Sequence, residues 1–260
     1  MPSHQGKVAL VTGGSSGIGQ AIVTRLASEG ATTAIADIAD GAETVEAARA
    51  AGGEAFWVPC DLADDGAIHS ATEAVQKRVG KADIFVHCAA VQFMKPFADL
   101  SVEEWRLVQR VNQEAAFHFV RALLPGMRAA AWGRIILIGS STYFINPSDM
   151  THYVTSKGAL MGFAHGLAGE VGRDGITVNV VAPGLTRTAH ANATVPDAFF
   201  KSIAAQQAFH AAASPRTRRE WFRSWPRRMR RSLPGRRYWS MAARLAPKPV
   251  AARLHCVRRP

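Results

Sequence analysis

Short apolar runs alternate with longer amphipathic segments along most of this chain, and this alternation restricts the fold more than any other feature. The apolar runs predict strands at residues 7–12, 32–37, 55–60, 83–87, 134–140 and 176–182. The segments between them predict helices at residues 17–29, 41–51, 64–79, 101–128 and 151–172. Nearly continuous apolar strands joined by helices are typical of a parallel sheet with helices on both faces. We therefore expect residues 1–208 to form a single doubly wound α/β domain.

Charge is distributed unevenly along the 260 residues, whose net charge is +11. Residues 209–260 hold 15 of the 31 Lys and Arg and only one acid, Glu220, so residues 1–208 form a mildly acidic body. The three widely spaced cysteines, Cys60, Cys88 and Cys256, favour free thiols in a reducing compartment and no metal site. With no secretory leader and no apolar run of membrane-spanning length, the sequence predicts a cytoplasmic protein.

A glycine-rich turn lies between the first predicted strand and helix, in the stretch VALVTGGSSGIGQAI. Gly13, Gly17 and Gly19 let the backbone approach a pyrophosphate, and the start of the helix offers unpaired N–H groups to it. Asp37 ends the next strand, 20 residues after Gly17. A carboxylate there accepts hydrogen bonds from the adenine ribose and repels a 2′-phosphate. The pattern predicts a Rossmann-type site that prefers NAD to NADP.

A second group of residues indicates acid–base chemistry. Tyr153 and Lys157 are four residues apart in a predicted helix, so their side chains lie on one face. An ammonium near a phenol favours the phenolate and lowers its pKa. Ser140 ends a predicted strand 13 residues before Tyr153, at the sheet edge where open α/β sheets bind ligands.

Over residues 5–208 the chain resembles the short-chain dehydrogenase/reductase family. The resemblance rests on the glycine turn and on the residues around the predicted sites. These are Thr12, Gly13, Ser16, Gly17, Ile18, Gly19, Asp61, Leu62, Asn112, Ser140, Tyr153, Lys157, Asn179, Pro183, Gly184, Thr186 and Thr188. The resemblance implies an NAD-dependent alcohol dehydrogenase or ketoreductase in which the cofactor carries the hydride.

The resemblance also implies roles for individual residues. Tyr153 would exchange a proton with the substrate oxygen, and Ser140 would hydrogen-bond the same oxygen. Lys157 would hold the nicotinamide ribose and depress the pKa of Tyr153, while Asn112 would hold a water of the proton relay. Asp61 would lie against the adenine, with Thr188 near the nicotinamide carboxamide.

One departure from the family pattern follows the fourth predicted strand. The family usually has Asn-Asn-Ala-Gly there, and this chain has His87-Cys88-Ala89-Ala90. We expect Ala89 and Ala90 to border the cofactor, with Ala90 crowding it slightly. Cys88 is expected to be a small buried residue and not a redox thiol. His152, beside Tyr153, is expected to pack on its helix or line the pocket.

Apolar and aromatic residues predict the substrate class. Phe93, Met94, Tyr143, Phe144 and Leu185 lie in loops after predicted strands, although ordinary packing would explain them equally well. The stretches SSTYF, THYVTSKGA, VGRDGITVN and PGLTRTA resemble the (S)-1-phenylethanol dehydrogenases of the family. They imply an apolar or aryl secondary alcohol or ketone, of the 1-phenylethanol and acetophenone type. The alternative is a 3-oxoacyl-carrier-protein reductase. Residues 187–208 would form a lid over the substrate.

The basic tail, residues 209–260, is anomalous for this family. The family has a further helix there, a last strand with Thr-Gly-Gln, and a terminal Asp-Gly-Gly. Read one base out of frame, the tail permits the string VVSFLASxDAxFITGQTLLVDGG, which supplies those motifs. We therefore interpret residues 209–260 as out-of-frame translation of the last helix and strand, with a frameshift near residues 208–214. As a natural sequence, this tail would leave a sheet edge exposed and put the activity in question.

The tail also supports a rival hypothesis from a different class of proteins. Six arginines interleaved with two tryptophans and a tyrosine in residues 224–243 would suit nucleic-acid phosphates and bases. On the frameshift interpretation these arginines say nothing about a partner, and no nucleic acid or membrane is expected. The family resemblance implies a homotetramer or dimer through the segments 101–128 and 151–172.

Overall fold

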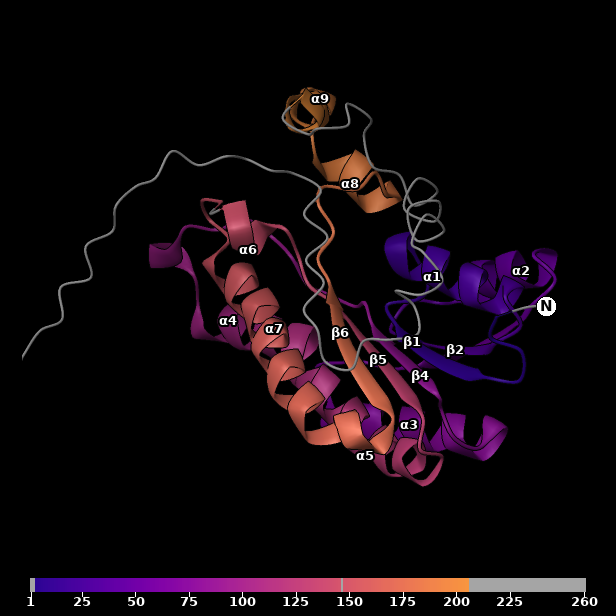
Figure 1. The fold of residues 1–260 in the computed structure, drawn as a ribbon. Coiled ribbons are helices and arrows are strands. Elements are labelled where there is room, and N and C mark those ends of the chain that lie inside the picture. Colours follow the sequence, from indigo (N-terminus) through magenta and orange to yellow (C-terminus); the bar gives the residue numbers. More distant parts are fainter. Residues whose placement is uncertain (1–2, 146, 206–260) are drawn as a thin grey trace, which may run out of the picture.

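The computed structural model of the protein describes residues 3–145 and 147–205 and contains a six-stranded parallel sheet. The strand order is β3-β2-β1-β4-β5-β6 (Figure 1). The strands are β1 (Val8–Thr12), β2 (Thr32–Asp37), β3 (Glu54–Pro59), β4 (Ile84–His87), β5 (Gly133–Ile138) and β6 (Ile176–Val181). Each predicted strand is present, with ends shifted by at most two residues. The order reverses between β1 and β4, which is where open parallel sheets bind their ligands.

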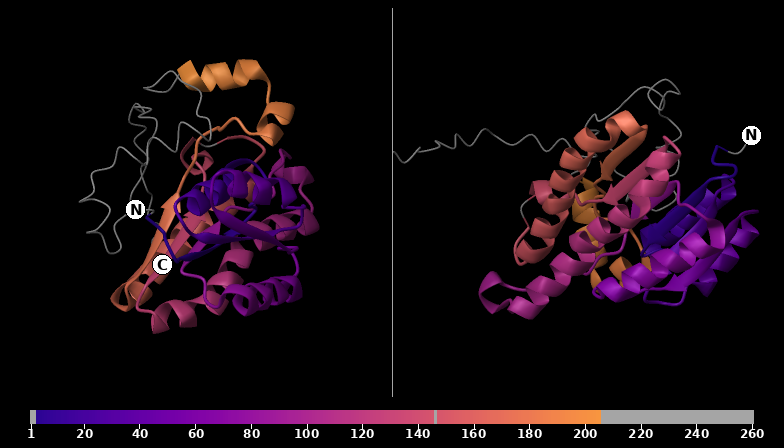
Figure 2. Two further views of the ribbon diagram at one scale, coloured as in Figure 1. Left: turned by 90° about the vertical axis from the view of Figure 1, so that its right-hand side faces the viewer. Right: turned by 90° about the horizontal axis from the view of Figure 1, so that it is seen from below.

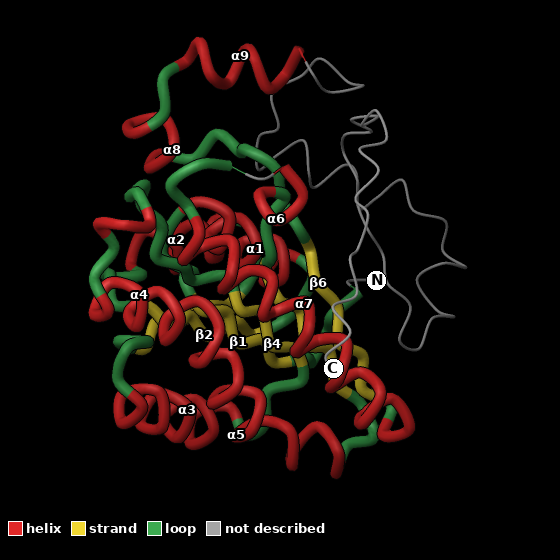
Figure 3. The backbone as a smooth tube through the Cα atoms, turned by 90° about the vertical axis from the view of Figure 1, so that its left-hand side faces the viewer, coloured by secondary structure: helices red, strands yellow, loops and turns green. Residues whose placement is uncertain are grey.

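Helices cover both faces of the sheet, and strand residues alternate between two cores. Ala9 and Val11 pack with α1 (Gly17–Ser28) and α2 (Ala42–Ala50) on one face. Leu10 packs on the other face, with α3 (Asp65–Val79), α5 (Ala115–Ala129) and α7 (Thr151–Val171). Figure 2 shows the layers from two further directions, and Figure 3 looks onto the face covered by α3, α5 and α7. Burial on both faces explains the continuous apolar strands.

The helix predicted at residues 101–128 is present, but a π-helical turn divides it. The structure has α4 (Val102–Gln109), then a π-helical turn, η2 (Arg110–Glu114), and then α5. Ser101 and Glu104 form a capping box that starts α4. Apolar periodicity continues through the π turn, so the sequence pattern gave no sign of it. The widened turn holds Asn112.

Short helices complete the described part of the chain. Two 3₁₀ turns, η1 (Phe97–Asp99) and η3 (Gly172–Asp174), and the short helix α6 (Thr142–Ile145) lie in connections. The predicted lid region contains α8 (Ala189–Thr194) and α9 (Asp197–Ala205), which lie beyond the carboxyl ends of the strands (Figure 1). The basic tail, its frameshift interpretation and Cys256 fall outside the described residues.

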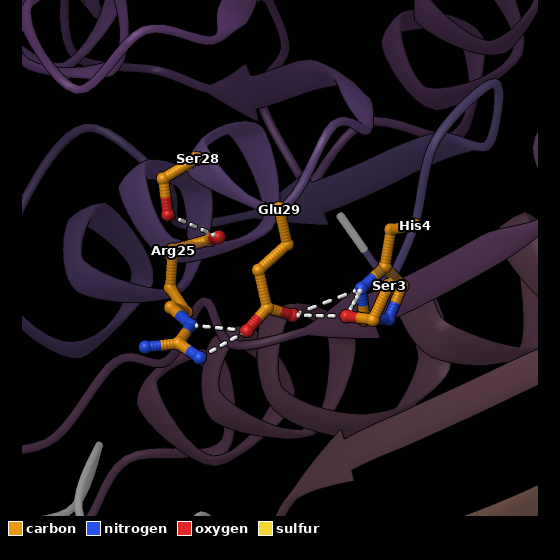
Figure 4. Close-up of polar contacts among 5 residues, drawn as sticks. All are labelled: Ser3, His4, Arg25, Ser28 and Glu29. Atoms are coloured by element: carbon orange, nitrogen blue, oxygen red, sulfur yellow. Dashed lines mark hydrogen bonds and ion pairs between the residues drawn. The ribbon is translucent and has the colours of Figure 1, made fainter. Parts of the chain in front are cut away.

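Glu29 ties the start of the chain to the end of α1 (Figure 4). Its carboxylate accepts from the Ser3 hydroxyl at 2.8 Å and from Arg25 Nε at 2.6 Å, and it pairs with His4 Nδ1 at 2.9 Å. Burial alone would raise the pKa of Glu29, but these partners hold it below its usual value. The network therefore fixes the segment that leads into β1.

Asp83, just before β4, is a buried carboxylate on which an acid-stability prediction rests. It is 3% exposed, accepts from the backbone N–H of Val8 at 3.0 Å and pairs with Lys81 and Lys7. Burial raises its pKa, but these partners outweigh burial and lower it. Because the pKa is lower in the folded than in the unfolded state, the stabilisation is complete above about pH 4 and is lost as the pH falls further.

We expect Asp83→Asn to lower the free energy of unfolding by about 1–3 kcal/mol at pH 7, because it removes a charge-assisted bond. The difference from the unmodified protein should shrink between pH 4 and pH 2, as measured by urea unfolding. A difference that stays constant over that range would contradict this assignment.

Candidate functional site

The glycine turn brings the backbone of β1 against the loop after β4. Gly13 has φ +67°, and a Cβ on it would lie 2.6 Å from the Ala89 backbone nitrogen. A Cβ on Gly19 would lie 1.9 Å from the Gly13 carbonyl oxygen. Both positions therefore require glycine. Ser16 is exposed at the N-cap of α1 and Ile18 is half-buried behind it. The turn leaves the start of α1 open to an anion.

Asp37 lies beside this turn with a fixed carboxylate. Its Oδ2 accepts from the backbone N–H of Ser15 at 2.9 Å, and its Oδ1 accepts from Ala39 at 3.1 Å. The side chain is half-buried, while the neighbouring Ile38 is 72% exposed. The predicted pairing of the glycine turn with Asp37 is thus present in the structure.

The loop after β4 packs against the glycine turn and would form the next part of the cofactor site. The Thr12 hydroxyl accepts from the backbone N–H groups of Cys88 at 3.1 Å and Ala89 at 3.3 Å. Burial raises the pKa of the Cys88 thiol to about 11, so the thiol stays protonated. A protonated thiol favours the expected inert residue over a redox thiol, although Cys88 is half-buried and not fully buried as expected. Ala90 is exposed where the loop turns away.

Tyr153 and Ser140 meet at the end of β5. Tyr153 is 9% exposed and Ser140 7% exposed. The Ser140 Oγ accepts from the Thr142 hydroxyl at 2.8 Å and from the Thr142 backbone N–H at 3.2 Å, which leaves its own hydrogen for the phenol. Burial raises the pKa of Tyr153, and the hydrogen bond with Ser140 opposes that rise without cancelling it. Thr142 was not predicted as a site residue, although its position two residues after Ser140 permits an ST-type turn.

Lys157 lies about one helical turn after Tyr153 on α7 and is 1% exposed. Its ammonium donates to the Ile138 carbonyl at 2.8 Å and lies 5.7 Å from the centre of the Tyr153 ring. Desolvation lowers the pKa of Lys157 to about 8. The structure differs here from the expected depression of the tyrosine pKa. The ammonium is directed at the Ile138 carbonyl at the end of β5. Burial of the phenol therefore determines the direction in which the pKa of Tyr153 shifts.

Asn112 is held on every side by hydrogen bonds. Its Oδ1 accepts from Val91 N at 2.7 Å, and its Nδ2 donates to the Val91 carbonyl and to Ser156 Oγ, each at 3.0 Å. Its backbone carbonyl is 3.1 Å from His87 Nε2. The side-chain amide is therefore fully occupied by protein partners. Ser156 and His87 were not predicted as site residues, and no spacing signal indicated either of them.

The remaining predicted cofactor residues lie along the same sheet edge. Asp61 is exposed and accepts from the backbone N–H of Ala63, and Leu62 is buried beside it. The Pro183 carbonyl accepts from Ser141 N at 2.9 Å, which joins the loop after β6 to the loop after β5. Thr186 is buried and donates to the Gly184 carbonyl, and Leu185 is half-buried. Thr188 lies against Gly17 and caps α8.

Among the predicted pocket residues, one side chain is held by a ring-stacking contact and three others are exposed to solvent. Phe93 is half-buried and stacks on His152, with ring centres 4.3 Å apart; His152 is fully buried, and its Nε2 lies 3.2 Å from the Phe93 carbonyl oxygen. Met94 is 70% exposed, Tyr143 48% and Phe144 47%. The Tyr143 ring lies 2.7 Å from a Cβ built on Gly158, directly after Lys157. Apolar surface thus extends from the loops after β4 and β5 to the helix that carries Tyr153.

Within the described residues, none of the helices has the length and apolar character needed to span a membrane. The sequence profile of the short chain dehydrogenases matches residues 7–198. The chain is 39% identical to 3-oxoacyl-(acyl-carrier-protein) reductase FabG of Pseudomonas aeruginosa over 188 residues, which cover 72% of this chain and 76% of that protein. It is 35% identical to D-beta-hydroxybutyrate dehydrogenase of Rhizobium meliloti over 195 residues, covering 74% and 76%.

Solved structures show the same relationship. One neighbour is a putative NAD(P) dependent gluconate 5-dehydrogenase of Beutenbergia cavernae with bound NADP. It has a TM-score of 0.77 and 32% identity, covering 83% of this chain and 87% of that one. The parallel sheet and the helices that flank it agree with these structural neighbours. The chain belongs to the short-chain dehydrogenase family, whose members are oxidoreductases that use a nicotinamide cofactor.

Proposed function

We propose that this protein is an NAD-dependent oxidoreductase that interconverts an apolar or aryl secondary alcohol with its ketone. The observation that carries the proposal is the buried phenol of Tyr153, hydrogen-bonded with Ser140 beside the Lys157 ammonium. A phenol and a hydroxyl that converge on one point can hold a carbonyl or hydroxyl oxygen between them. At the carboxyl edge of the sheet, which also carries the glycine turn, that oxygen would lie near the expected cofactor site.

Each side chain has a distinct task in this proposal. Tyr153 gives its proton to the ketone oxygen during reduction and takes it back during alcohol oxidation. Ser140 donates a hydrogen bond to the same oxygen, and Lys157 holds the nicotinamide ribose. The Asn112 carbonyl holds a water that returns the proton to solvent. The nicotinamide cofactor, when bound, supplies or accepts the hydride.

The preference for NAD rests on Asp37. The carboxylate is anchored by two backbone N–H groups and lies where the adenine ribose would be bound. It would accept from the ribose hydroxyls and repel a 2′-phosphate. The adjacent side chain, Ile38, brings no positive charge to balance a phosphate. Asp61 and Leu62 would border the adenine.

The apolar substrate class rests on Phe93, Met94 and Tyr143, which lie in the connections after β4 and β5. A pocket with apolar walls and two polar groups that fix one oxygen suits a ketone with an aryl or alkyl substituent. Residues 187–205, with α8 and α9, would close over it. The 39% identity to a 3-oxoacyl reductase favours that activity as the second candidate.

A substrate panel separates the two candidates. NADH or NADPH oxidation would be followed with acetophenone and its ring-substituted analogues, and with a 3-oxoacyl thioester. We expect kcat/KM with acetophenones to exceed that with the thioester by at least about tenfold, which corresponds to about 1.4 kcal/mol of transition-state binding. A higher kcat/KM with the thioester would support the 3-oxoacyl reductase activity in place of the aryl ketone reductase.

A further inference from the structure

We propose that His87 is a positioning residue: its neutral imidazole joins the end of β1, which carries the cofactor turn, to the π turn, which carries Asn112. The proposal rests on the proposed function, because it concerns the geometry of that site. The family pattern has a shorter Asn at this place, so the imidazole bridge is a feature of this chain's own sequence. His87 is 0% exposed and lies at the last position of β4.

The hydrogen bonds determine the tautomer of His87. Nε2 is 3.1 Å from the Asn112 carbonyl oxygen, which only accepts, so Nε2 carries the hydrogen. Burial, with the charge of Lys157, lowers the pKa of His87 to about 3, so the ring is neutral at physiological pH and has one N–H. Nδ1 is therefore an acceptor, and the Thr12 hydroxyl, 3.0 Å away, donates to it. Each of the two bonds has one possible direction.

The Thr12 hydroxyl is fully used by this arrangement. Its hydrogen is directed at His87, and its oxygen accepts from the backbone N–H groups of Cys88 and Ala89. Ala89 is the residue against which Gly13 packs. The Thr12 end of the bridge thus fixes the backbone of Cys88 and Ala89, against which Gly13 of the cofactor turn packs.

The other end meets the π turn where a donor is needed. In a π turn the helical bonds shift from i+4 to i+5, so carbonyl groups at the widening become available to other donors. His87 Nε2 supplies such a donor to Asn112. From Asn112 the bonds continue through Nδ2 to Ser156 Oγ, which donates to the Tyr153 carbonyl at 2.7 Å. A continuous chain of hydrogen bonds therefore runs from the cofactor turn to the backbone of Tyr153.

The test compares two variants of His87 with a matched control. His87→Leu removes both bonds, whereas His87→Gln keeps an amide N–H at the position of Nε2. The control is Thr72→Val in α3, which removes a buried bond of the same kind, from Thr72 Oγ1 to the Ile68 carbonyl at 2.8 Å, away from the site. Each full-length protein is measured for kcat, for KM of ketone and cofactor, and for Tm.

We expect His87→Leu to lower kcat on the order of 10²-fold, the loss typical of a small displacement of a reacting group. His87→Gln should restore most of kcat, and Thr72→Val should lower Tm without changing kcat. If His87→Leu only lowers Tm, with kcat equal to that of Thr72→Val, His87 is a structural residue and the proposal is overturned.

A second measurement does not depend on turnover. Nitrogen chemical shifts of histidine-labelled protein at neutral pH should show His87 with Nε2 protonated and Nδ1 not. A protonated Nδ1 overturns the bridge, whatever the activity. If the protein with the expected tautomer reduces no ketone of the panel, the proposed function fails while the bridge stands.

Discussion

Tyr153→Phe is expected to lower kcat for ketone reduction by about 10²–10⁴-fold, the range of a lost general acid. The ring would still fill its buried site, but the proton donor to the substrate oxygen and the partner of Ser140 would be gone. Binding of NADH, followed by its fluorescence, should stay within about threefold of the unmodified protein, because the lost hydroxyl acts mainly in the transition state.

The matched control is Tyr143→Phe, which removes the hydroxyl of an exposed tyrosine in the connection after β5. It should change KM for the ketone and leave kcat close to the unmodified value. Equal kcat values for Tyr153→Phe and the unmodified enzyme would show that another group transfers the proton.

The raised pKa of Tyr153 also gives the sign of a pH dependence. Ketone reduction needs the protonated phenol, which is present at neutral pH and is lost as the pH rises through the raised pKa. Alcohol oxidation needs the phenolate, so its rate should increase with pH over the same interval. Both profiles should disappear from the residual activity of Tyr153→Phe.

Asp37→Asn is expected to shift the ratio of kcat/KM for NAD to kcat/KM for NADP by about 10²-fold toward NADP. The change keeps an oxygen that can accept from the Ser15 or Ala39 N–H, but it removes the negative charge that repels a 2′-phosphate. Like charges in contact cost several kcal/mol, and about 2.7 kcal/mol corresponds to 10²-fold. Steady-state kinetics with both cofactors measures the shift.

Asp40→Asn provides the control for a general change in charge. Asp40 is exposed, and its carboxylate accepts from the backbone N–H of Ala42 outside the turn. The Asp40→Asn variant should leave the ratio of kcat/KM for NAD to kcat/KM for NADP unchanged. An equal shift in both variants would mean that the loss of negative charge near the site, and not Asp37 itself, sets the preference.

The sheet was predictable from the sequence because burial on both faces requires nearly continuous apolar strands. The glycine turn, Asp37 and the Tyr153 and Lys157 pair were predictable for a related reason: each depends on spacing within one turn, one helix or one strand–helix unit. Gly19 shows this most clearly, since close approach to the Gly13 carbonyl oxygen leaves no room for a side chain.

The parts that could not be predicted depend on contacts between distant segments. The π turn follows from the bonds of Asn112 with Val91 and Ser156, which local helical periodicity does not encode. The bridge through His87 joins residues 75 and 25 positions away in the chain. The pKa of Tyr153 depends on how deeply the folded protein buries it, and the Tyr-x-x-x-Lys spacing alone suggested the opposite direction.

The side chains proposed to select the substrate and those proposed to transfer the proton have very different surroundings. Met94 and Tyr143 lie largely exposed on loops, whereas Lys157 and Asn112 are almost fully buried and held by hydrogen bonds from three parts of the chain. Exposed positions tolerate substitution at small cost in stability, and buried hydrogen-bonded ones do not. The fold therefore allows the proposed substrate-selecting residues to be exchanged at small cost in stability, whereas exchange within the proposed proton-transfer centre would destabilise the protein.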